Sequence, residues 1–519
     1  MSERIYLSTT IPYVNARPHL GFALELVQAD ALARHWRQRG SAVRFQTGTD
    51  DNSLKTVLSA QASGVEVADL ARRNADAFEA LREPLALSSD DFIRTGSDPR
   101  HRPAAERLWR ACAARGDIYR RQYNGLYCVG CEQFYRAAEL VAGRCPEHGT
   151  EPETVTEENW FFRLSRYTGL LQEAIKSGRL RVEPAGRRNE VLAFLAAGLE
   201  DFSISRAAGR AHGWGIPVPG DPGQVMYVWW DALCNYISAL GYGLGDGGDY
   251  PYWWADSDRR VHLVGKGVLR FHAVYWPAML ASARLPLPTG VLVHDYLTVA
   301  GRKISKSSPA AADAEPAALV ARYGTDAIRW WLLREVPRTG DTDVTVERIV
   351  ARANGDLAGG IGNLVSRTVA MVHRYRAGAV PDAGAPGPDA ARPTAARLNA
   401  ARQDAPGLVH AALEDYDFRA ATGAVWRIAE EANRYLEQAA PWQLARAARE
   451  DPQAAAQLDT VLATAAGACR ELGVQLAPFV PGLAARIEAQ CGPAVLPPPE
   501  PVFPRIADPG IPEPPAPAA

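Results

Sequence analysis

Four potential metal ligands lie close together in the sequence. Cys128 and Cys131 form one pair, Cys145 and His148 form a second pair with the same internal spacing, and 13 residues separate the two pairs. Thiolate and imidazole groups in such paired spacing are typical ligands of tetrahedral Zn²⁺. Because four protein ligands leave no open coordination position, we predict one structural zinc site. The alternative is that the cysteines are buried apolar residues and the histidine lies on the surface.

A turn that contains a histidine and a glycine precedes a predicted helix. His19 and Gly21 lie between a strand pattern at residues 4–10 and an amphipathic stretch that ends at Gly40. The first turn of a helix carries N–H groups and the positive end of the helix dipole, both of which favour phosphate binding. Gly21 allows close backbone approach, and His19 can donate to a phosphate oxygen as charge develops. A histidine here can equally be a helix cap or a surface residue.

A short loop at residues 301–308 is rich in lysine and serine. It contains Lys303 and Lys306, with three serine hydroxyl groups nearby. Two ammonium groups on flexible side chains suit the binding of a departing pyrophosphate. Only five of the 57 basic residues are lysines and two of them lie here, which favours a functional role over a solvated charged loop.

The composition is that of a folded protein with several domains. A length of 519 residues corresponds to about three domains. With 47% hydrophobic residues, 22% charged residues and a formal net charge of −2, the chain is neither disordered nor a basic nucleic-acid coat. The N-terminus has no signal-peptide core, and no apolar stretch of about 18 residues could span a membrane. We therefore expect a cytoplasmic protein with no membrane partner, and seven cysteines, three of them clustered, fit a reducing compartment.

Strand and helix patterns divide the chain into regions. Strand patterns at 4–10 and 42–46 flank a helix pattern, which predicts the first βαβ unit of a doubly wound sheet with ligands at the carboxyl ends of its strands. Residues 118–227 have the composition of an insertion, and strand patterns return at 226–229 and 261–264. From residue 311 to about 490 the pattern is helical, apart from a predicted loop at 377–393. Residues 493–519 are proline-rich, so we expect them to be extended and disordered.

Ordered segments along nearly the whole chain resemble the class I aminoacyl-tRNA synthetases, and specifically the methionyl-tRNA synthetase family. Residues 12–22 are similar to the His-x-Gly-His signature of that class, and residues 303–307 to its Lys-Met-Ser-Lys-Ser loop. The further segments that support the resemblance are residues 47–50, 127–131, 158–164, 189–192, 214–219, 227–232, 262–266, 270–272 and 275–277.

The resemblance implies an α/β fold in which a Rossmann-type, doubly wound parallel sheet is split by a zinc-binding insertion and followed by an α-helical anticodon-binding domain. The implied regions are the first half of the catalytic domain at 1–117, the insertion at 118–227, the second half at 228–310, a linking helical segment at 311–350, the anticodon-binding domain at 351–490 and a tail at 491–519. The chain lacks the additional oligonucleotide-fold domain that dimerises some family members, so we expect a monomer.

The activity that the resemblance implies is that of a methionine–tRNA ligase. The carboxylate of L-methionine attacks the α-phosphate of ATP, bound with Mg²⁺, and the adenylate then passes to the 3′-terminal ribose of tRNA(Met). By resemblance, the catalytic residues are His19, Lys303 and Lys306, and ATP is bound by His19, Gly21, Gly265, Lys303 and Lys306. Positioning and charge neutralisation dominate such chemistry, which suits a histidine and lysines.

The resemblance also assigns the amino-acid and anticodon sites. Asp50 would pair with the α-ammonium group, and the side-chain pocket would be lined by Ile11, Trp229, Ala232, Leu233, Tyr236, Phe271, His272 and Trp276. An apolar aromatic pocket suits a thioether, although the tryptophans taken alone favour simple core packing. The anticodon readers would be Asn363, Arg367 and Trp442, since an aromatic ring stacks on an unpaired base while amide and guanidinium groups read its edges.

Several positions depart from the family pattern. Phe22 replaces the second histidine of the signature, and Asn52 replaces a histidine in the segment 50–53. The family's Gly-Lys-Asp is Gly-Lys-Gly at 265–267, so Gly267 lacks a carboxylate that is expected near the ATP ribose. Asp295 stands where glycine is common in the family, and Ser-Pro stands at 308–309 where Leu-Gly is usual. Each lost polar contact to a charged ligand costs about 1.5–3 kcal/mol.

These departures leave alternative functions open. The chain can be a repurposed paralogue, either a non-catalytic tRNA-binding or regulatory protein or a ligase that passes an aminoacyl-adenylate to another acceptor. The lysine loop argues against the first alternative. The complete set of anticodon residues argues against the second.

Overall fold

The computed structural model describes residues 2–130, 132–135, 137–147, 149–299, 302–303, 315–382 and 393–507. The described residues form two compact units. The N-terminal unit comprises residues 2–83 and 87–296, and the C-terminal unit comprises residues 84–86 together with the described residues from 297 onward.

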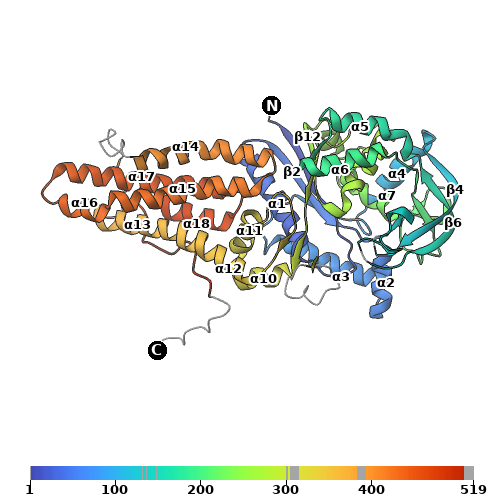
Figure 1. Ribbon diagram of the computed structural model, residues 1–519, viewed down its shortest axis with the longest axis horizontal. Coiled ribbons are helices and arrows are strands. Elements are labelled where there is room, and N and C mark those ends of the chain that lie inside the picture. The colour runs from blue at the N-terminus through green and yellow to red at the C-terminus, as the bar shows by residue number, and fades with distance from the viewer. Residues whose placement is uncertain are drawn as a thin grey trace. The chain divides into compact units, whose positions relative to one another are not determined.

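A six-stranded parallel sheet forms the centre of the N-terminal unit (Figure 1). Its strands, in spatial order, are β3 (Asp91–Arg94), β2 (Ala42–Thr49), β1 (Arg4–Thr9), β12 (Arg259–Gly265), β13 (Gly290–His294) and β7 (Arg181–Glu183). Residues 5–9 of β1 are all buried. Parallel strands covered on both faces are apolar along their length instead of alternating, which explains the run Ile-Tyr-Leu at 5–7.

The order of the strands reverses between β1 and β12. From β1 the following strands are added toward β3, and from β12 the next strand is added on the other side. Loops at the carboxyl ends of the two central strands diverge at such a point and leave a crevice for ligands. The two segments that enter this crevice are the turn before helix α1 (Leu20–Gln38) and the Gly-Lys-Gly segment that follows β12.

Helices pack around this sheet and begin at recognisable caps. Helix α2 (Leu54–Ser63) starts where the Ser53 hydroxyl accepts from the Thr56 N–H at 3.2 Å, and it ends at Gly64, whose φ of 63° favours glycine. The other helices of the unit are α3 (Val67–Glu79), α4 (His101–Ala114), α5 (Thr168–Lys176), α6 (Ala185–Ala196), α7 (Val228–Leu233), α8 (Asn235–Ser238) and α9 (Trp276–Ser282).

Two small antiparallel sheets lie in the stretch predicted as an insertion. They are formed by β4 (Ile118–Cys128), β5 (Gln133–Tyr135), β6 (Glu153–Phe162) and β8 (Phe202–Ser203), and by β9 (Ser205–Ala207), β10 (Pro217–Val218) and β11 (Asp221–Met226). The predicted strand at 226–229 is wrong, because β11 ends at Met226 and α7 begins at Val228. Residues 226–228 are buried and Trp229 is half-buried, and a short, largely buried apolar run does not distinguish a strand from a helix.

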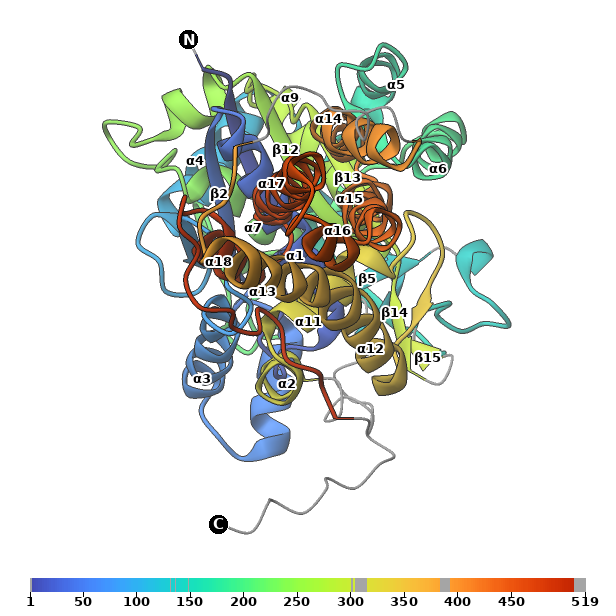
Figure 2. The same ribbon diagram turned by 90° about the vertical axis from the view of Figure 1, so that its left-hand side faces the viewer.

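The C-terminal unit is mainly helical. Figure 1 shows its long helices side by side, and Figure 2 looks along their axes. Its helices are α10 (Pro316–Tyr323), α11 (Thr325–Arg334), α12 (Val346–Arg352), α13 (Asn363–Arg376), α14 (Pro393–Glu414), α15 (Phe418–Ala439), α16 (Pro441–Ala447), α17 (Pro452–Leu476) and α18 (Pro481–Cys491), with a small sheet of β14 (Leu297–Val299), β15 (Arg302–Lys303) and β16 (Thr342–Asp343). None of the helices in the described residues is long and apolar enough to cross a bilayer.

The prediction that the tail is disordered is wrong up to residue 507, because side chains of the helical region bond its backbone. The His373 ring lies 3.0 Å from the Leu496 carbonyl oxygen and 2.8 Å from that of Pro497. The Asn354 side chain bonds both backbone groups of Ile506, at 2.9 and 2.8 Å. The proline-rich composition does not reveal that helical side chains bond the backbone of this segment.

Candidate active site

His19 caps helix α1 at the crevice. Its Nδ1 accepts from the Gly21 N–H at 3.1 Å, so the helix-cap alternative is confirmed. A neutral ring that accepts at Nδ1 carries its proton on Nε2. With Nδ1 used by the cap, Nε2 is the ring atom that carries the donor proton. A Cβ at Gly21 would lie 3.0 Å from the His19 ring, so glycine preserves the space that this cap needs.

Phe22 packs into the core. It is 6% exposed and meets Phe78 edge-to-face, with ring centroids 5.3 Å apart. The position that the resemblance gives to a second phosphate-binding histidine is therefore filled by a buried apolar side chain. The replacement of histidine by Phe22 is therefore not a change on the surface. The phenyl ring is part of the packing of α1 against α3.

Buried carboxylates gather at the carboxyl end of β2. Asp50 is 1% exposed, and its backbone N–H donates to the Pro12 carbonyl at 2.9 Å. Burial raises the pKa of Asp50 well above its usual value, and the nearby carboxylates of Asp231, Glu132 and Asp51 raise it further. Burial also raises the pKa of Asp51, to about 6. Such a concentration of negative charge in an enclosed place favours a cationic ligand group.

Asn52 connects two of these carboxylates. Its backbone N–H donates to Asp50 at 3.3 Å, and its side-chain amide donates to Asp231 at 2.7 Å. The other oxygen of Asp231 lies 2.5 Å from Nε2 of the fully buried His101, whose Nδ1 lies 2.8 Å from the Ser238 hydroxyl. Sequence reasoning missed this pair because 130 positions separate the two residues: Asp231 lies in the segment 227–232 that supports the resemblance, but nothing in that segment shows that His101 is its partner.

Three of the predicted methionine-pocket residues form one buried cluster. The Tyr236 hydroxyl lies 2.6 Å from His272 Nε2, and the Tyr236 and Trp276 rings are 5.9 Å apart. Burial lowers the pKa of His272 to about 4, so its ring is neutral at pH 7. Because its Nδ1 is 2.9 Å from the Val268 carbonyl, Nδ1 carries the proton and Nε2 accepts from Tyr236. This cluster is aromatic and uncharged, and its polar atoms bond one another or the backbone.

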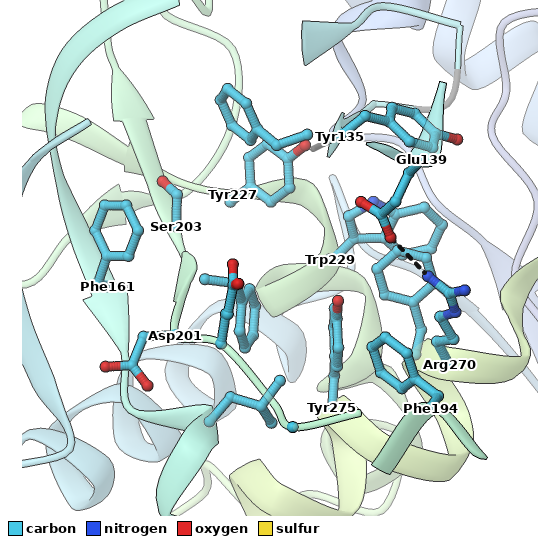
Figure 3. Close-up of a pocket in the computed structure, with 16 residues that line it drawn as sticks. Tyr135, Glu139, Phe161, Phe194, Asp201, Ser203, Tyr227, Trp229, Arg270 and Tyr275 are labelled. Atoms are coloured by element: carbon cyan, nitrogen blue, oxygen red, sulfur yellow. Dashed lines mark hydrogen bonds and ion pairs between the residues drawn. The ribbon is translucent and has the colours of Figure 1, made fainter. Parts of the chain in front are cut away.

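The remaining predicted pocket residues lie in different surroundings. Ala232 and Leu233 are buried in α7, and Ile11 is half-buried in the turn after β1. Trp229 and Phe271 stack with centroids 3.7 Å apart, and both line a cavity of about 130 Å³. Figure 3 shows this cavity surrounded by aromatic side chains, with Arg270 and the Glu139 carboxylate 3.4 Å apart at one side. Of the nine predicted methionine contacts, only Trp229 and Phe271 line this cavity.

The carboxyl ends of β12 and β13 form the other side of the crevice. Gly265 and His294 are register partners at the ends of these strands. Lys266 follows Gly265, and its ammonium nitrogen lies 4.5 Å from the centre of the Tyr296 ring and 3.8 Å from Asp295. A Cβ at Gly267 would lie 2.2 Å from the Tyr296 hydroxyl oxygen.

Glu25 joins the two sides of the crevice. Its carboxylate accepts from the Thr10 N–H at 2.6 Å and lies 2.9 Å from His294 Nε2. Burial acts to lower the pKa of His294, but the hydrogen bond and charge of Glu25 outweigh it and raise that pKa. Sequence reasoning missed this pair, although an acidic residue on a buried helix face is a signal that it has a partner.

The predicted zinc and lysine residues are described only in part. Cys128 and Cys145 are buried in one small cluster with Tyr135, whose hydroxyl lies 3.7 Å from the Cys145 sulfur. Cys131 and His148 lie outside the described residues, and among the residues that are described no three metal-binding side chains converge. Lys303 ends β15, whereas Lys306 lies outside the described residues.

The predicted anticodon residues all lie in the C-terminal unit. Asn363 is exposed and Arg367 is half-buried, one helical turn apart on α13. Trp442 on α16 is 47% exposed. A large aromatic side chain exposed to this extent presents a face on which another ring can stack.

Comparison with known proteins decides the family. The profile described as "tRNA synthetases class I (M)" matches residues 5–154 and 136–369. The methionine–tRNA ligase of Brucella suis is 40% identical over 528 aligned residues, covering 98% of each chain. The chain belongs to the class I methionyl-tRNA synthetase family.

Other relatives agree. The methionine–tRNA ligase of Mycobacterium bovis is 40% identical and covers 98% of this chain and 99% of its own. The structure of Mycobacterium tuberculosis methionyl-tRNA synthetase in complex with methionyl-adenylate superposes with a TM-score of 0.90 at 38% identity, covering 97% of this chain and all of the other. Family membership confirms the predictions of a class I aminoacyl-tRNA synthetase and of an α/β fold with a parallel sheet followed by a helical region.

Proposed function

We propose that the protein activates L-methionine with ATP and transfers it to tRNA(Met). The observation that carries this proposal is the pairing of two unlike environments beside the crevice. The Asp50 carboxylate and its acidic neighbours favour a cation, and the cluster of Tyr236, His272 and Trp276 is neutral and aromatic. A zwitterionic amino acid with a thioether side chain requires both.

Binding of methionine places its α-ammonium group at Asp50. The ammonium group places a positive charge beside Asp50, so it favours the ionised form of Asp50 when the substrate binds. The thioether contacts the rings of Tyr236 and Trp276. The neutral His272 holds the Tyr236 hydroxyl, which fixes that ring without placing a charge beside the side chain.

Activation then requires no base. An oxygen of the substrate carboxylate attacks the α-phosphorus of ATP, the bond from that phosphorus to the bridging oxygen breaks, and pyrophosphate leaves with the electron pair. His19 donates from Nε2 to a phosphate oxygen, and the positive end of the α1 dipole and Gly21 and Gly265 adjoin the nucleotide. Lys303 and Lys306 neutralise the departing pyrophosphate, and Mg²⁺ accompanies ATP as part of the substrate.

Transfer uses the product of the first step. A hydroxyl of the 3′-terminal ribose attacks the carbonyl carbon of the adenylate, the bond from that carbon to the phosphate oxygen breaks, and AMP leaves while its phosphate takes up the proton of the hydroxyl. Asn363, Arg367 and Trp442 read the anticodon in the C-terminal unit. The exposed ring of Trp442 supports this role because stacking on an unpaired base needs an accessible aromatic face.

A zinc ion would be held by Cys128, Cys131, Cys145 and His148. Cys128 and Cys145 fit it, because their thiols come from separate segments and lie in one buried cluster. The bound ion would supply structural cross-linking of the segment and no catalytic chemistry. We further propose that the protein is a cytoplasmic monomer and that the regions 1–117, 118–227, 228–310, 311–350, 351–490 and 491–519 are its functional divisions.

Two assays on one preparation test the proposal. Methionine-dependent ATP–pyrophosphate exchange, run against the other amino acids, measures activation, and charging of tRNA(Met) measures transfer. Trp442→Ala is expected to reduce charging at limiting tRNA and to leave the exchange rate unchanged. Exchange that depends on another amino acid, or equal loss of both activities in the variant, would contradict the proposal.

One alternative retains support from specific residues. Phe22 lies in the core and Gly267 lacks a carboxylate, which a repurposed tRNA-binding paralogue would tolerate. That alternative predicts binding of tRNA(Met) without methionine-dependent exchange. A ligase with another acceptor predicts the exchange but no charging of tRNA(Met).

A further inference from the structure

The nucleotide side of the crevice contains an unusual group of neighbouring residues. Gly267 and Asp295 are two of the positions that depart from the family pattern, and the structure brings both beside Tyr296. Asp295 precedes Tyr296 in the chain, and Gly267 follows Lys266, whose ammonium group lies over the Tyr296 ring. The two departures therefore belong to one local arrangement.

The Tyr296 hydroxyl occupies the space in front of Gly267. A Cβ built on Gly267 would lie 2.2 Å from the hydroxyl oxygen and 3.5 Å from the ring carbon that bears it. The first distance is far inside a van der Waals contact, whereas the second is an ordinary one. A carboxylate at 267 and the tyrosine in its present position exclude each other. The polar atom that fills this volume here is the phenolic oxygen.

Charged side chains pack around the tyrosine. Asp295 has a side chain that is only 8% exposed, and it contacts both the Arg187 guanidinium and, at 3.8 Å, the Lys266 ammonium. That ammonium lies 4.5 Å from the centre of the Tyr296 ring, within the range of a cation–π contact. The aspartate at 295 therefore anchors the lysine that rests on the tyrosine.

We propose that Tyr296 replaces the missing carboxylate as the side chain that hydrogen-bonds the ribose of ATP. This inference rests on the proposed function, because it assigns one contact within the same ATP site. A phenol both donates and accepts, so it can bond a ribose hydroxyl as a carboxylate does, but as a neutral group. Gly267 provides the space and the pair of Asp295 and Lys266 provides the position.

Tyr296→Phe tests the assignment by removing one oxygen atom. In methionine-dependent ATP–pyrophosphate exchange we expect the KM for ATP to rise roughly three- to tenfold, as for one lost hydrogen bond, with the KM for methionine unchanged. With one of the two nucleotides 2′-deoxy-ATP and 3′-deoxy-ATP, the variant and the wild type should have the same KM, because that nucleotide already lacks the bonded hydroxyl. Tyr252→Phe, at a tyrosine that is 48% exposed, is the matched control.

A second position sharpens the test. Gly267→Ala should raise the KM for ATP in the wild type, because its Cβ displaces the Tyr296 hydroxyl. In the Tyr296→Phe background the same change should add nothing, since the nearest atom is then the ring carbon at 3.5 Å. Additive effects of the two changes would overturn the proposal.

Two further results would also overturn it. One is an unchanged KM for ATP in Tyr296→Phe, and the other is an equal loss with ATP and both deoxynucleotides. Calorimetric titration of the three nucleotides in the presence of methionine separates this proposal from the proposed function. If the wild type shows no exchange but binds ATP more tightly than a deoxynucleotide, and Tyr296→Phe abolishes that difference, the proposed function is contradicted and the contact between Tyr296 and the ribose is supported.

Discussion

The amino-acid side and the nucleotide side of the crevice differ in how their polar groups are held. On the amino-acid side, Asp50 and the pair of Tyr236 and His272 are buried, and their partners are buried too. On the nucleotide side, Lys266 and Tyr296 keep contact with solvent.

This difference fits two of the departures from the family pattern, Gly267 and Asp295, whereas Asn52 and Phe22 depart from it in more buried surroundings. A buried polar network loses more than one contact when a single member changes, because the partner is left unsatisfied at a cost of about 1–3 kcal/mol. At a half-exposed edge, water and neighbouring side chains can replace a lost group. Gly267 and Asp295 are accommodated in this way around Tyr296.

Asp50→Asn, on the amino-acid side, is expected to cause the largest loss of activity. Removing the charge that pairs with the α-ammonium group should lower kcat/KM for methionine by about 100- to 1,000-fold, on the order of 3–4 kcal/mol, because the partner is a buried charge. Pyrophosphate exchange at varied methionine and ATP measures it. Asp249→Asn, at a carboxylate that is 58% exposed, should have no effect. An equal loss of affinity for ATP would show that Asp50 acts on both sides of the crevice, which would contradict the comparison.

His19→Asn separates capping from chemistry on the nucleotide side. Asparagine is a good N-cap, so α1 and the melting temperature should be retained, whereas the donor at the ring Nε2 is lost. We expect kcat for exchange to fall roughly 10- to 100-fold. His19→Ala should show the same loss together with about 1 kcal/mol of destabilisation. If asparagine retains full activity, His19 is only a cap.

The pH dependence of stability tests the acidic cluster. Because the pKa of Asp51 is raised to about 6, the folded state binds more protons than the unfolded state between about pH 4 and 6. Stability therefore falls as the pH rises through this interval, by an amount on the order of 3 kcal/mol, and the cost persists above it. Asp51→Asn should be more stable than the wild type at pH 7, with the difference shrinking toward pH 4 in urea unfolding. A difference that grows toward pH 4 would reverse the assigned sign.

Phe22→His should have the smallest effect on activity. The new imidazole would occupy the buried position against Phe78, so it should not bind phosphate, and kcat/KM for ATP should change by less than about twofold. Burial of an unpaired polar ring should instead destabilise the fold by about 1–3 kcal/mol. Thermal unfolding and exchange on the same sample measure both quantities. A clear gain in exchange rate would show that the family's second histidine was a missing contact.

Much of the fold followed from local pattern. The strand and helix patterns of the first 50 residues predicted β1, α1 and β2, and the family resemblance extended this to the whole chain. The run at 226–229 was assigned wrongly because burial hides periodicity, and the tail was assigned wrongly because side chains such as His373 and Asn354 fix its backbone. The composition of a segment does not show which side chains elsewhere in the protein bond its backbone.

The site was predictable only where a residue lies in a motif. His19 and Asp50 were found because they follow strands within recognisable segments. Asp231, His101 and Glu25 were missed because their importance arises from contacts between residues far apart in sequence. The sequence names the departures at 267 and 295 one by one, and the position of Tyr296 shows that they belong to one arrangement.

A crystal structure of this protein with methionyl-adenylate tests the central claim most directly, because both sides of the crevice are then occupied by one ligand. We predict that the ammonium group of the ligand lies within hydrogen-bonding distance of Asp50 and that a ribose hydroxyl lies within that distance of the Tyr296 hydroxyl. An ammonium group bound away from Asp50 would contradict the account of the amino-acid side. A ribose that turns away from Tyr296 would contradict the account of the nucleotide side.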